Sequence, residues 1–394
     1  MSARIPRVSL GLLLSALCLS KSALAQERTV IDANFPGAYQ VEVQDVNGDK
    51  RPDVIAVGGS TCAWYENPTW KKRIVATGKQ TPGIISSATA DLDGDGKAEI
   101  AIAYEFNMNK PPTGKLLLAR QGAGPDDPWK LEPIADVPSI HRLRWGDLEG
   151  DGRLDLVVAP IFGREARPPD YTDPARLQVF SSPQDPEHRK WTSAVVGTRP
   201  VIHAIEIVSF GTGRRSQVLT ASNHGVDLFL LFKGAGSVPL SHGAPGKVPK
   251  QGSSEVHLGR LADGKRFLAT VEPWHGNEVV VAREKTTTAS SRDATVFGPR
   301  LVIDDTLADG HALWVADIDG DHDDEIFAGH RGKDHRVSMY KLDHASQSWT
   351  RTVLDREVAA QDLRGADVDG DGTPDVVTVG GSTHNVVLYR FPRR

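Results

Sequence analysis

An acidic nine-residue motif recurs along this chain and limits what the chain can fold into. Its copy at Asp317 (DIDGDHDDE) has acids at positions 1, 3, 5 and 9, glycine at position 4 and an apolar residue at position 2. Close copies start at Asp45 (DVNGDKRPD), Asp91 (DLDGDGKAE), Asp147 (DLEGDGRLD) and Asp367 (DVDGDGTPD). A repeat with a period of tens of residues indicates an array of similar structural units.

The spacing of the copies predicts the number of units. Position 1 falls at 45, 91, 147, 317 and 367, and the interval of 170 residues between the third and fourth copies is about three periods long. Two degenerate copies fill this interval, with position 1 at Ser209 and at Gly259. Both keep the apolar flanks of the motif and have lost its acids. The chain is therefore predicted to contain seven units.

Each unit has the pattern of four short strands. One apolar strand precedes the motif, an apolar strand rich in β-branched residues follows it, and two more strand-like runs come before the next copy. Seven such units predict an all-β, seven-bladed β-propeller. The segment Arg28–Asp32 (RTVID) is a near copy of the fourth strand Arg351–Asp355 (RTVLD), so the N-terminal strand is expected to close the last blade.

The N-terminus has the features of a secretory signal peptide. An apolar run over Leu10–Leu19 follows a basic start, and Ala23 and Ala25 fit a cleavage site. We therefore expect a signal peptide over residues 1–25, a single propeller domain over residues 26–394, and a secreted or periplasmic protein.

Cysteine content and charge limit how the fold can be stabilised and which partners the chain can bind. Cys62 would be the only cysteine of the mature chain, so no intrachain disulfide is expected. Loss of the signal would leave 43 basic and 51 acidic side chains, a formal charge of −8. This balance argues against a nucleic-acid partner and favours bound cations. No other apolar run is long enough to span a membrane, and nothing indicates an oligomeric state.

The acidic motif is typical of a calcium loop. Side-chain oxygens at positions 1, 3, 5 and 9, with a backbone carbonyl at position 7, can surround one hard cation, and the glycine allows a tight bend. About five structural Ca²⁺ sites are therefore predicted, which would fasten each blade and leave no open position for a substrate. Metal-free Asx-turn loops are the alternative. The predicted ligands are Asp45, Asn47, Asp49, Asp53; Asp91, Asp93, Asp95, Glu99; Asp147, Glu149, Asp151, Asp155; Asp317, Asp319, Asp321, Glu325; and Asp367, Asp369, Asp371, Asp375.

Histidines gather at equivalent positions on the opposite face. Six residues before position 1 the units carry Tyr39, Ile85, His141, His203, Ser253, His311 and Gln361. Five residues after position 9 they carry Gly58, Tyr104, Pro160, Ser222, Glu272, His330 and Gly380. Because first strands line a propeller axis, His141, His203, His311 and His330 are expected to converge there. They would form a divalent-metal site (Zn²⁺ or Mg²⁺) or a general acid/base site. The alternative is a set of structural histidines around a water-filled axis.

The repeats resemble the FG-GAP/VCBS propeller repeats of integrin α chains and of many secreted bacterial proteins, which implies the fold and little about function. A narrower resemblance lies in HRLRW from His141, APIFG from Ala159, EPWHGN from Glu272 and VIDDTLADGH ending at His311. These segments look like the propeller domain of the aldos-2-ulose dehydratase family, which dehydrates 2-keto sugars such as 1,5-anhydro-D-fructose.

The resemblance implies a carbohydrate hydro-lyase with a small sugar substrate. Elimination of water beside a ketone needs a base for the α-proton, an electrophile for the enolate oxygen and an acid for the departing hydroxyl. His311 or His141 is the predicted base. Arg164, Arg142 or a histidine-bound metal would hold the enolate oxygen, and Glu272 or Tyr104 would assist the leaving group. His203, His330 and His275 complete the set of candidate catalytic residues.

Two other functions fit the same fold. The protein could be a non-catalytic, calcium-stabilised propeller that binds a glycan or a protein partner, in which case converging titratable groups would be unnecessary. It could also be a polysaccharide lyase, which would need a long groove across the face rather than a pocket.

Overall fold

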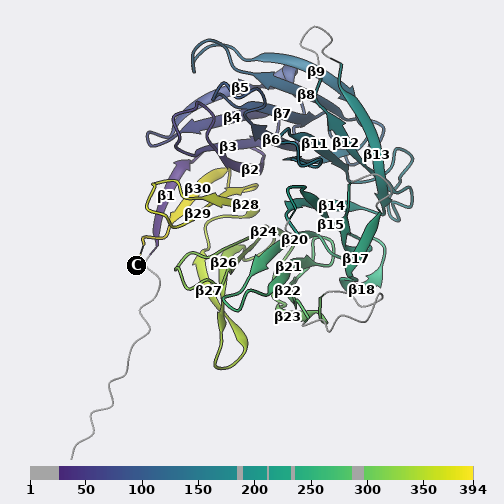
Figure 1. Cartoon of the computed structure of the whole chain (residues 1–394), viewed down its shortest axis with the longest axis vertical. Coiled ribbons are helices and arrows are strands. Elements are labelled where there is room, and N and C mark those ends of the chain that lie inside the picture. The colour runs from purple at the N-terminus through teal and green to yellow at the C-terminus, as the bar shows by residue number, and fades with distance from the viewer. Residues whose placement is uncertain (1–25, 184–189, 211–212, 232–235, 286–296, 394) are drawn as a thin grey trace, which may run out of the picture.

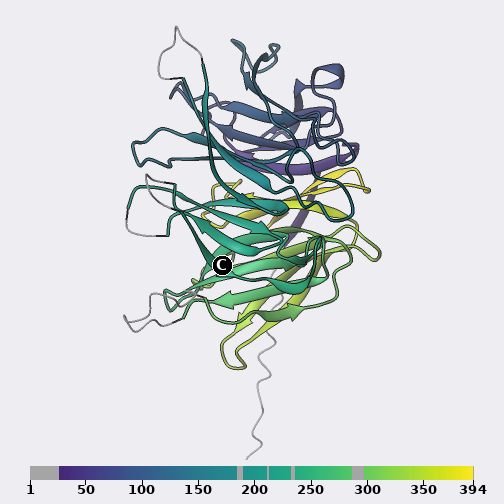
Figure 2. The same ribbon diagram turned by 90° about the vertical axis from the view of Figure 1, so that its right-hand side faces the viewer.

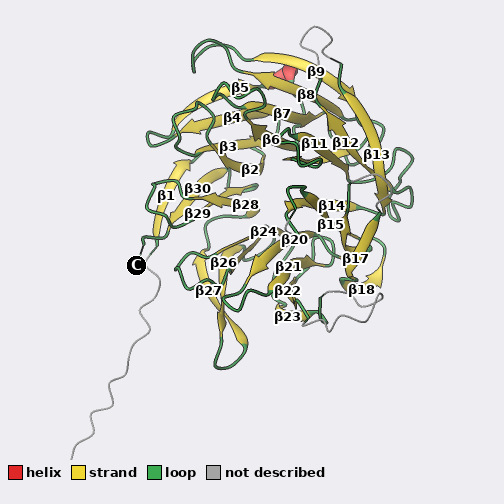
Figure 3. Cartoon of the chain, in the orientation of Figure 1, coloured by secondary structure: helices red, strands yellow, loops and turns green. Residues whose placement is uncertain are grey.

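Seven four-stranded antiparallel sheets surround a central axis in the computed structural model, as the sequence predicts (Figure 1). The structure describes residues 26–183, 190–210, 213–231, 236–285 and 297–393. In this part of the chain the only helix is a single 3-10 turn, η1 (Gly78–Gln80), and nearly everything else is strand or loop (Figure 3). The predicted signal peptide, residues 1–25, lies outside the described residues.

Each blade is a meander of four strands. Blades 1 to 3 are β2 (Ala38–Gln44), β3 (Asp53–Gly58), β4 (Thr61–Glu66), β5 (Lys71–Ala76); β6 (Ser86–Ala90), β7 (Glu99–Tyr104), β8 (Lys115–Arg120), β9 (Lys130–Asp136); and β10 (Ile140–Gly146), β11 (Asp155–Pro160), β12 (Ala175–Ser181), β13 (Thr192–Arg199). Blades 4 and 5 are β14 (Ile202–Val208), β15 (Gln217–Ser222), β16 (Gly225–Phe229), β17 (Ser237–Ser241); and β20 (Glu255–Arg260), β21 (Arg266–Glu272), β22 (Glu278–Arg283), β23 (Leu301–Asp304). Blade 6 is β24 (Gly310–Ala316), β25 (Glu325–His330), β26 (Arg336–Asp343), β27 (Ser348–Asp355).

The seventh blade combines both ends of the described chain. Its strands are β28 (Ala360–Ala366), β29 (Asp375–Gly380), β30 (Asn385–Arg390) and β1 (Glu27–Asp32), and β1 pairs antiparallel with β30. The Arg28 guanidinium also contacts the Asp355 carboxylate of blade 6 at 2.7 Å. A short hairpin that the repeat pattern does not predict, β18 (Ala244–Lys247) and β19 (Lys250–Gly252), lies between blades 4 and 5.

The hydrophobic core is divided among the joints between blades. Seven buried clusters each combine side chains of two neighbouring blades, and one of them joins Val54 and Tyr65 of blade 1 to Val377 and Val379 of blade 7. Since each fully buried aliphatic side chain contributes about 1.5–3 kcal/mol, every joint is held by its own packed layer. The first strands of the blades lie innermost (Figure 1), and Figure 2 shows the same ring from the side.

Aspartate–tyrosine hydrogen bonds reinforce three of these joints. In each, an Asp at the end of a fourth strand accepts a hydrogen bond from a Tyr in the third strand of the next blade: Tyr65 to Asp32 at 2.6 Å, Tyr340 to Asp304 at 2.7 Å and Tyr389 to Asp355 at 2.7 Å. Lys72, Arg351 and Arg28 approach the same carboxylates, respectively. No helix among the described residues has the length and apolar character needed to cross a bilayer.

Candidate functional site

Five side chains are aimed at the axis by β-bulges in the first strands. In blades 1, 3, 4, 6 and 7 the pairing between first and second strand shifts register around a single residue, and these residues are Tyr39, His141, His203, His311 and Gln361. A bulge leaves the extra residue outside the ladder and redirects its side chain. The bulges therefore explain why these five positions differ from the regular inward and outward alternation of the strands.

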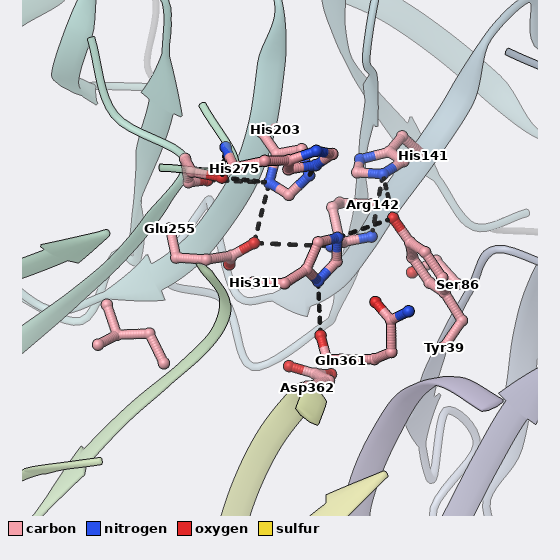
Figure 4. A network of polar contacts seen from close by, with 12 residues as sticks. Tyr39, Ser86, His141, Arg142, His203, Glu255, His275, His311, Gln361 and Asp362 are labelled. Carbon is pink, nitrogen blue, oxygen red and sulfur yellow. Dashed lines mark hydrogen bonds and ion pairs between the residues drawn. The ribbon is translucent and has the colours of Figure 1, made fainter. Parts of the chain in front are cut away.

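Three histidines bring imidazole nitrogens to one point (Figure 4). One ring nitrogen from each of His203, His275 and His311 lies within 4.8 Å of the others, and the Nε2 atoms of His203 and His275 are 3.0 Å apart. His203 and His311 come from bulged first strands, whereas His275 lies in the turn between β21 and β22 with φ of 47°. Residues of three neighbouring blades, 4, 5 and 6, thus form one cluster.

The partners of the outer ring nitrogens determine the tautomers. His311 Nδ1 lies 2.6 Å from the Gln361 carbonyl oxygen, and His203 Nδ1 lies 3.1 Å from the Ser254 carbonyl oxygen and 2.9 Å from Glu255 Oε1. These oxygens can only accept, so Nδ1 carries the hydrogen in both rings. The Nε2 lone pairs of both rings therefore face the shared space.

His141 and Tyr39 extend the cluster. The Tyr39 hydroxyl lies 3.0 Å from His141 Nε2 and 3.3 Å from His311 Nε2, and the rings of His141 and His203 have centroids 5.0 Å apart. The side chains of His141, His203 and His311 are almost fully buried, whereas Tyr39 and His275 are partly exposed. A molecule that approaches along the axis would therefore meet Tyr39 and His275 first.

The electrostatics of the cluster favour neutral imidazoles. Burial lowers the pKa of His141 and His203 well below the usual range, and the Arg142 guanidinium lowers both pKa values further. Burial, followed by the charge of Arg331, has the same effect on the pKa of His311. The cluster can therefore accept protons or coordinate a cation at neutral pH through the unprotonated Nε2 atoms of His203 and His311.

The donor set fits a divalent metal ion. Three imidazole nitrogens are a known ligand set for Zn²⁺, and a second shell of oxygen acceptors on Nδ1, as on His203 and His311, is typical of metal-binding histidines. Such a three-ligand site keeps one position open. His203, His275 and His311 are the residues that could hold the ion.

The structure does not bring four of the predicted catalytic residues to this cluster. His330 ends a second strand, where its Nδ1 lies 3.2 Å from the Ala308 carbonyl oxygen, and it is not one of the converging histidines. Arg164 is exposed beside Glu165. Tyr104 packs on the apolar joint between blades 1 and 2.

Glu272, the fourth, is fully buried and has other partners. It accepts hydrogen bonds from Ser253 and Thr270 and pairs with Arg300 at 2.8 Å. The second strands pair with the outer edge of the first strands, so they lie one strand further from the axis. Predicting their convergence from the strand end alone was therefore wrong.

Sequence reasoning passed over two members of the network. Tyr39 was aligned with the histidines, but its residue type drew no attention. Glu255 was missed because counting six residues back from Gly259 gives Ser253, whereas Glu255 lies two residues further on, at the start of β20, which pairs with β21 without a bulge.

The acidic loops fold alike in all five predicted copies. The carboxylate at position 1 accepts hydrogen bonds from the N–H groups of positions 4 and 6, as Asp45 does from Gly48 and Lys50 at 2.8 Å each. In four copies the acid at position 9 accepts from the N–H of position 2, as Asp53 does from Val46. Burial raises the pKa of Asp53 and of Asp375 to about 7.

Carboxylate oxygens converge within 4.8 Å in three of these loops: Asp91, Asp93, Glu99; Asp317, Asp319, Glu325; and Asp367, Asp369, Asp371. In the second of these, the Lys341 ammonium lies 2.7 Å from Asp319, 2.7 Å from Asp321 and 2.9 Å from Glu325. A protein cation thus stands among the oxygens that were predicted to hold Ca²⁺. Hard oxygen donors of this kind fit calcium.

Comparison with known proteins identifies two similar families. Residues 116–285 match the family model for the β-propeller domain of aldos-2-ulose dehydratase, and residues 45–102 match the FG-GAP-like repeat. The curated aldos-2-ulose dehydratase of Phanerodontia chrysosporium is 28% identical over 283 residues, which cover 64% of this chain. The chain spans about 30% of the length of that relative.

Solved structures support the fold. A structure of an Agrocybe aegerita lectin that recognises non-reducing terminal N-acetylglucosamine superimposes with a TM-score of 0.50 and 12% identity, covering 82% of this chain and 81% of the lectin. The extracellular domain of a one-component system from B. thetaiotaomicron gives a TM-score of 0.52 and 10% identity, covering 91% of this chain and 39% of that one. At such identities the likeness concerns architecture alone.

Proposed function

We propose that this seven-bladed propeller, which is similar to the propeller domain of aldos-2-ulose dehydratase, is a carbohydrate hydro-lyase. Its substrate would be a keto sugar such as 1,5-anhydro-D-fructose or an aldos-2-ulose, from which it eliminates water. The observation that carries the proposal is the convergence of neutral imidazoles from His203, His275 and His311, with His141 beside them, in a chain that matches the dehydratase propeller over residues 116–285.

The cluster offers the groups that this elimination needs. His141 or His311, each neutral and with an unprotonated Nε2 within reach of the Tyr39 hydroxyl, would take the proton α to the ketone. Arg142 lies against His141 at 3.2 Å, and its buried positive charge would stabilise the enolate oxygen. A divalent ion such as Zn²⁺ or Mg²⁺ on His203, His275 and His311 would supply a Lewis acid for the ketone oxygen, and His141 would then be the base, because the ion would occupy the His311 Nε2 lone pair.

Glu255 and Gln361 act as positioning residues behind the imidazoles. The Gln361 carbonyl fixes the His311 tautomer, and Glu255 lies between His203 Nδ1 at 2.9 Å and Arg142 at 3.7 Å. Their acceptor oxygens keep the Nε2 atoms unprotonated and directed at the axis. Replacing Glu255 would alter the basicity of His203, whereas the Gln361 acceptor is a backbone carbonyl that a substitution retains.

Absorbance tests the proposal directly. Dehydration of a keto sugar produces an enone that absorbs in the ultraviolet, so incubation with 1,5-anhydro-D-fructose or glucosone should raise the absorbance. His141→Ala and His311→Ala should abolish the rise, while His330→Ala, which changes a histidine outside the cluster, should retain it. Unchanged absorbance across a panel of keto sugars, together with retention on a glycan array, would favour a non-catalytic binding propeller.

We also propose that the acidic loops bind structural calcium and that the pairing of β1 with β30 closes the ring after removal of a signal peptide. The convergent carboxylates and the raised pKa values at position 9 support the first part, because a buried carboxylate group without a cation is costly. The secretory features of residues 1–25 support a secreted or periplasmic location.

A further inference from the structure

The Tyr39 hydroxyl occupies an unusual place in the histidine cluster. It lies within hydrogen-bond distance of two imidazole nitrogens, His141 Nε2 at 3.0 Å and His311 Nε2 at 3.3 Å (Figure 4). It has only one hydrogen to donate. The roles of the two neighbouring nitrogens therefore decide what this hydroxyl can do.

Both neighbouring nitrogens act as acceptors. His311 Nδ1 points to the Gln361 carbonyl oxygen at 2.6 Å and so carries the ring hydrogen, which leaves Nε2 as a lone pair. His141 Nε2 faces Arg142 Nη1 at 3.2 Å, and a guanidinium can only donate. The phenol oxygen thus lies between two groups that can take a proton and, once charged, can return it.

A negative charge on this oxygen would be stabilised where it forms. The Arg142 guanidinium lies over the Tyr39 ring, 5.2 Å from its centroid, and is almost fully buried. The positive charge of this guanidinium would attract the negative charge that develops on the phenol oxygen as its proton leaves. Tyr39 is also partly exposed, whereas His141 and His311 are buried behind it, so its hydroxyl is the more accessible proton donor.

We propose that Tyr39 is a further catalytic residue of the dehydration, the acid that protonates the departing hydroxyl. This role rests on the proposed function. When the imidazole of His141 or His311 removes the α-proton, the C–H electrons form the carbon–carbon double bond. The C–O bond breaks with its electron pair on oxygen, and the Tyr39 proton completes the water molecule. The imidazolium then returns its proton to the Tyr39 phenolate through their shared hydrogen bond.

This cycle balances without an external proton donor. The substrate loses one hydrogen from carbon and one hydroxyl, which together leave as water, and both side chains end in their starting protonation states. No oxidant or reductant takes part. A single phenol in contact with both candidate bases therefore serves the elimination whichever of the two imidazoles takes the proton.

The test compares two leaving groups in one variant. Tyr39→Phe keeps the ring and removes the acid, and a substrate whose departing hydroxyl is replaced by fluorine loses fluoride without protonation. With 1,5-anhydro-D-fructose, Tyr39→Phe should lower kcat by about 100-fold or more, the usual contribution of a general acid. With the deoxyfluoro analogue the loss should be several-fold smaller. A folding defect would reduce both rates alike. The ratio of the two losses therefore measures the contribution of Tyr39 as an acid.

A second readout separates this role from the proposed function. In D₂O, Tyr39→Phe should still exchange the α-hydrogen of the keto sugar, because the base is intact. Equal losses on both leaving groups, or a normal kcat with the hydroxyl substrate, would overturn the role of Tyr39 while leaving a working dehydratase. A wild-type protein that neither dehydrates nor exchanges hydrogen would instead overturn the proposed function, and this role with it.

Discussion

The two ends of the propeller axis use opposite kinds of chemistry. At one end five acidic loops stand apart from one another, and in three of them carboxylates converge within a single blade. At the other end imidazoles from different blades meet at a single point, with guanidinium groups around them. One first strand links the two, since β10 carries His141 at its start and leads into Asp147, about 20 Å away for a strand of this length.

This difference associates the acidic loops with stability and the histidine cluster with chemistry. A loop that encloses a cation within one blade can fasten that blade, but it leaves no group in common with its neighbours. A cluster built from blades 1, 3, 4, 5 and 6 exists only when the whole ring is assembled, as an active site requires. The repeat therefore supplies the scaffold, and departures from the repeat supply the function.

The largest effect is expected from removing one imidazole of the cluster. His203→Ala should leave two of the three converging nitrogens, abolish binding of Zn²⁺ at this site and reduce dehydration by at least about 100-fold, because losing only a second-shell partner already costs 10–100-fold. Metal content after dialysis and turnover of 1,5-anhydro-D-fructose measure this.

His330→Ala is the matched control for that experiment, since it removes a buried histidine outside the cluster. It should leave the metal content and the turnover close to those of the wild type. If His203→Ala retained its metal and its activity, the histidine cluster would not be the metal-binding and catalytic site.

A smaller effect, on stability alone, is expected at the acidic end. Calcium that binds only the folded protein stabilises each site by about 2.7 kcal/mol at a concentration 100 times its Kd. Calcium removed by a selective chelator should therefore lower Tm by several degrees and leave the geometry of the histidine cluster unchanged. Differential scanning calorimetry with and without added calcium measures this, and a Tm that does not respond would contradict the calcium proposal.

How far the sequence predicted this molecule depends on the kind of feature. Seven blades followed from the spacing of Asp45 and its equivalents, because a repeat unit must bury its apolar faces against its neighbours. The convergence of His203 and His311 followed from their common position in that repeat. His275 was placed nearby without a geometric reason, because it lies in a turn whose path the repeat does not define.

The misses share one physical cause. The repeat predicts strand ends, whereas side-chain direction depends on bulges, which add one residue to a strand without changing its apolar pattern. Glu255 lies two residues beyond the counted position in β20, which has no bulge, and Glu272 and Tyr104 were expected at the site although they lie on second strands, one strand further out. The functional site is therefore where the repeat pattern predicts least.

The pH dependence of stability should sharpen the contrast between the ends. At the acidic end, burial raises the pKa of Asp53 and Asp375 to about 7, so without calcium these groups stabilise the fold at low pH and lose that contribution as pH rises through 7. The stabilisation by calcium should accordingly grow between about pH 5 and pH 8. Tm measured in chelator and in calcium across this range tests it, with Asp53→Asn expected to flatten the difference.

At the histidine end stability changes with pH in the opposite direction. The pKa values of His141 and His203 are lowered by burial and by Arg142, so their contribution is complete above the unfolded value near 6.5 and is lost as pH falls below it. The metal-free protein should therefore lose stability on both sides of an optimum. Replacing His141 by Gln should weaken only the acid side of that profile, and an unchanged acid side would contradict the assignment.

The smallest expected effect separates the acidic loop at Asp317 from the one at Asp367. Lys341 follows Tyr340 in β26 and places its ammonium among Asp319, Asp321 and Glu325, whereas the equivalent residue of blade 7, Arg390, pairs with Glu27 of β1. Calcium must displace this ammonium, so the loop at Asp317 should bind it more weakly than the loop at Asp367.

Lys341→Met should therefore tighten calcium binding at one site. Because the Lys341 side chain is one-third exposed, its loss should cost at most about 1 kcal/mol in chelator. With calcium present that cost should shrink or reverse, since the ion takes over the neutralisation. Calorimetric titration with Arg390→Met as the control measures this. Equal calcium responses in the two variants would show that the Lys341 ammonium does not compete with calcium for the site. The loops at Asp317 and Asp367 would then not differ in calcium affinity on account of Lys341.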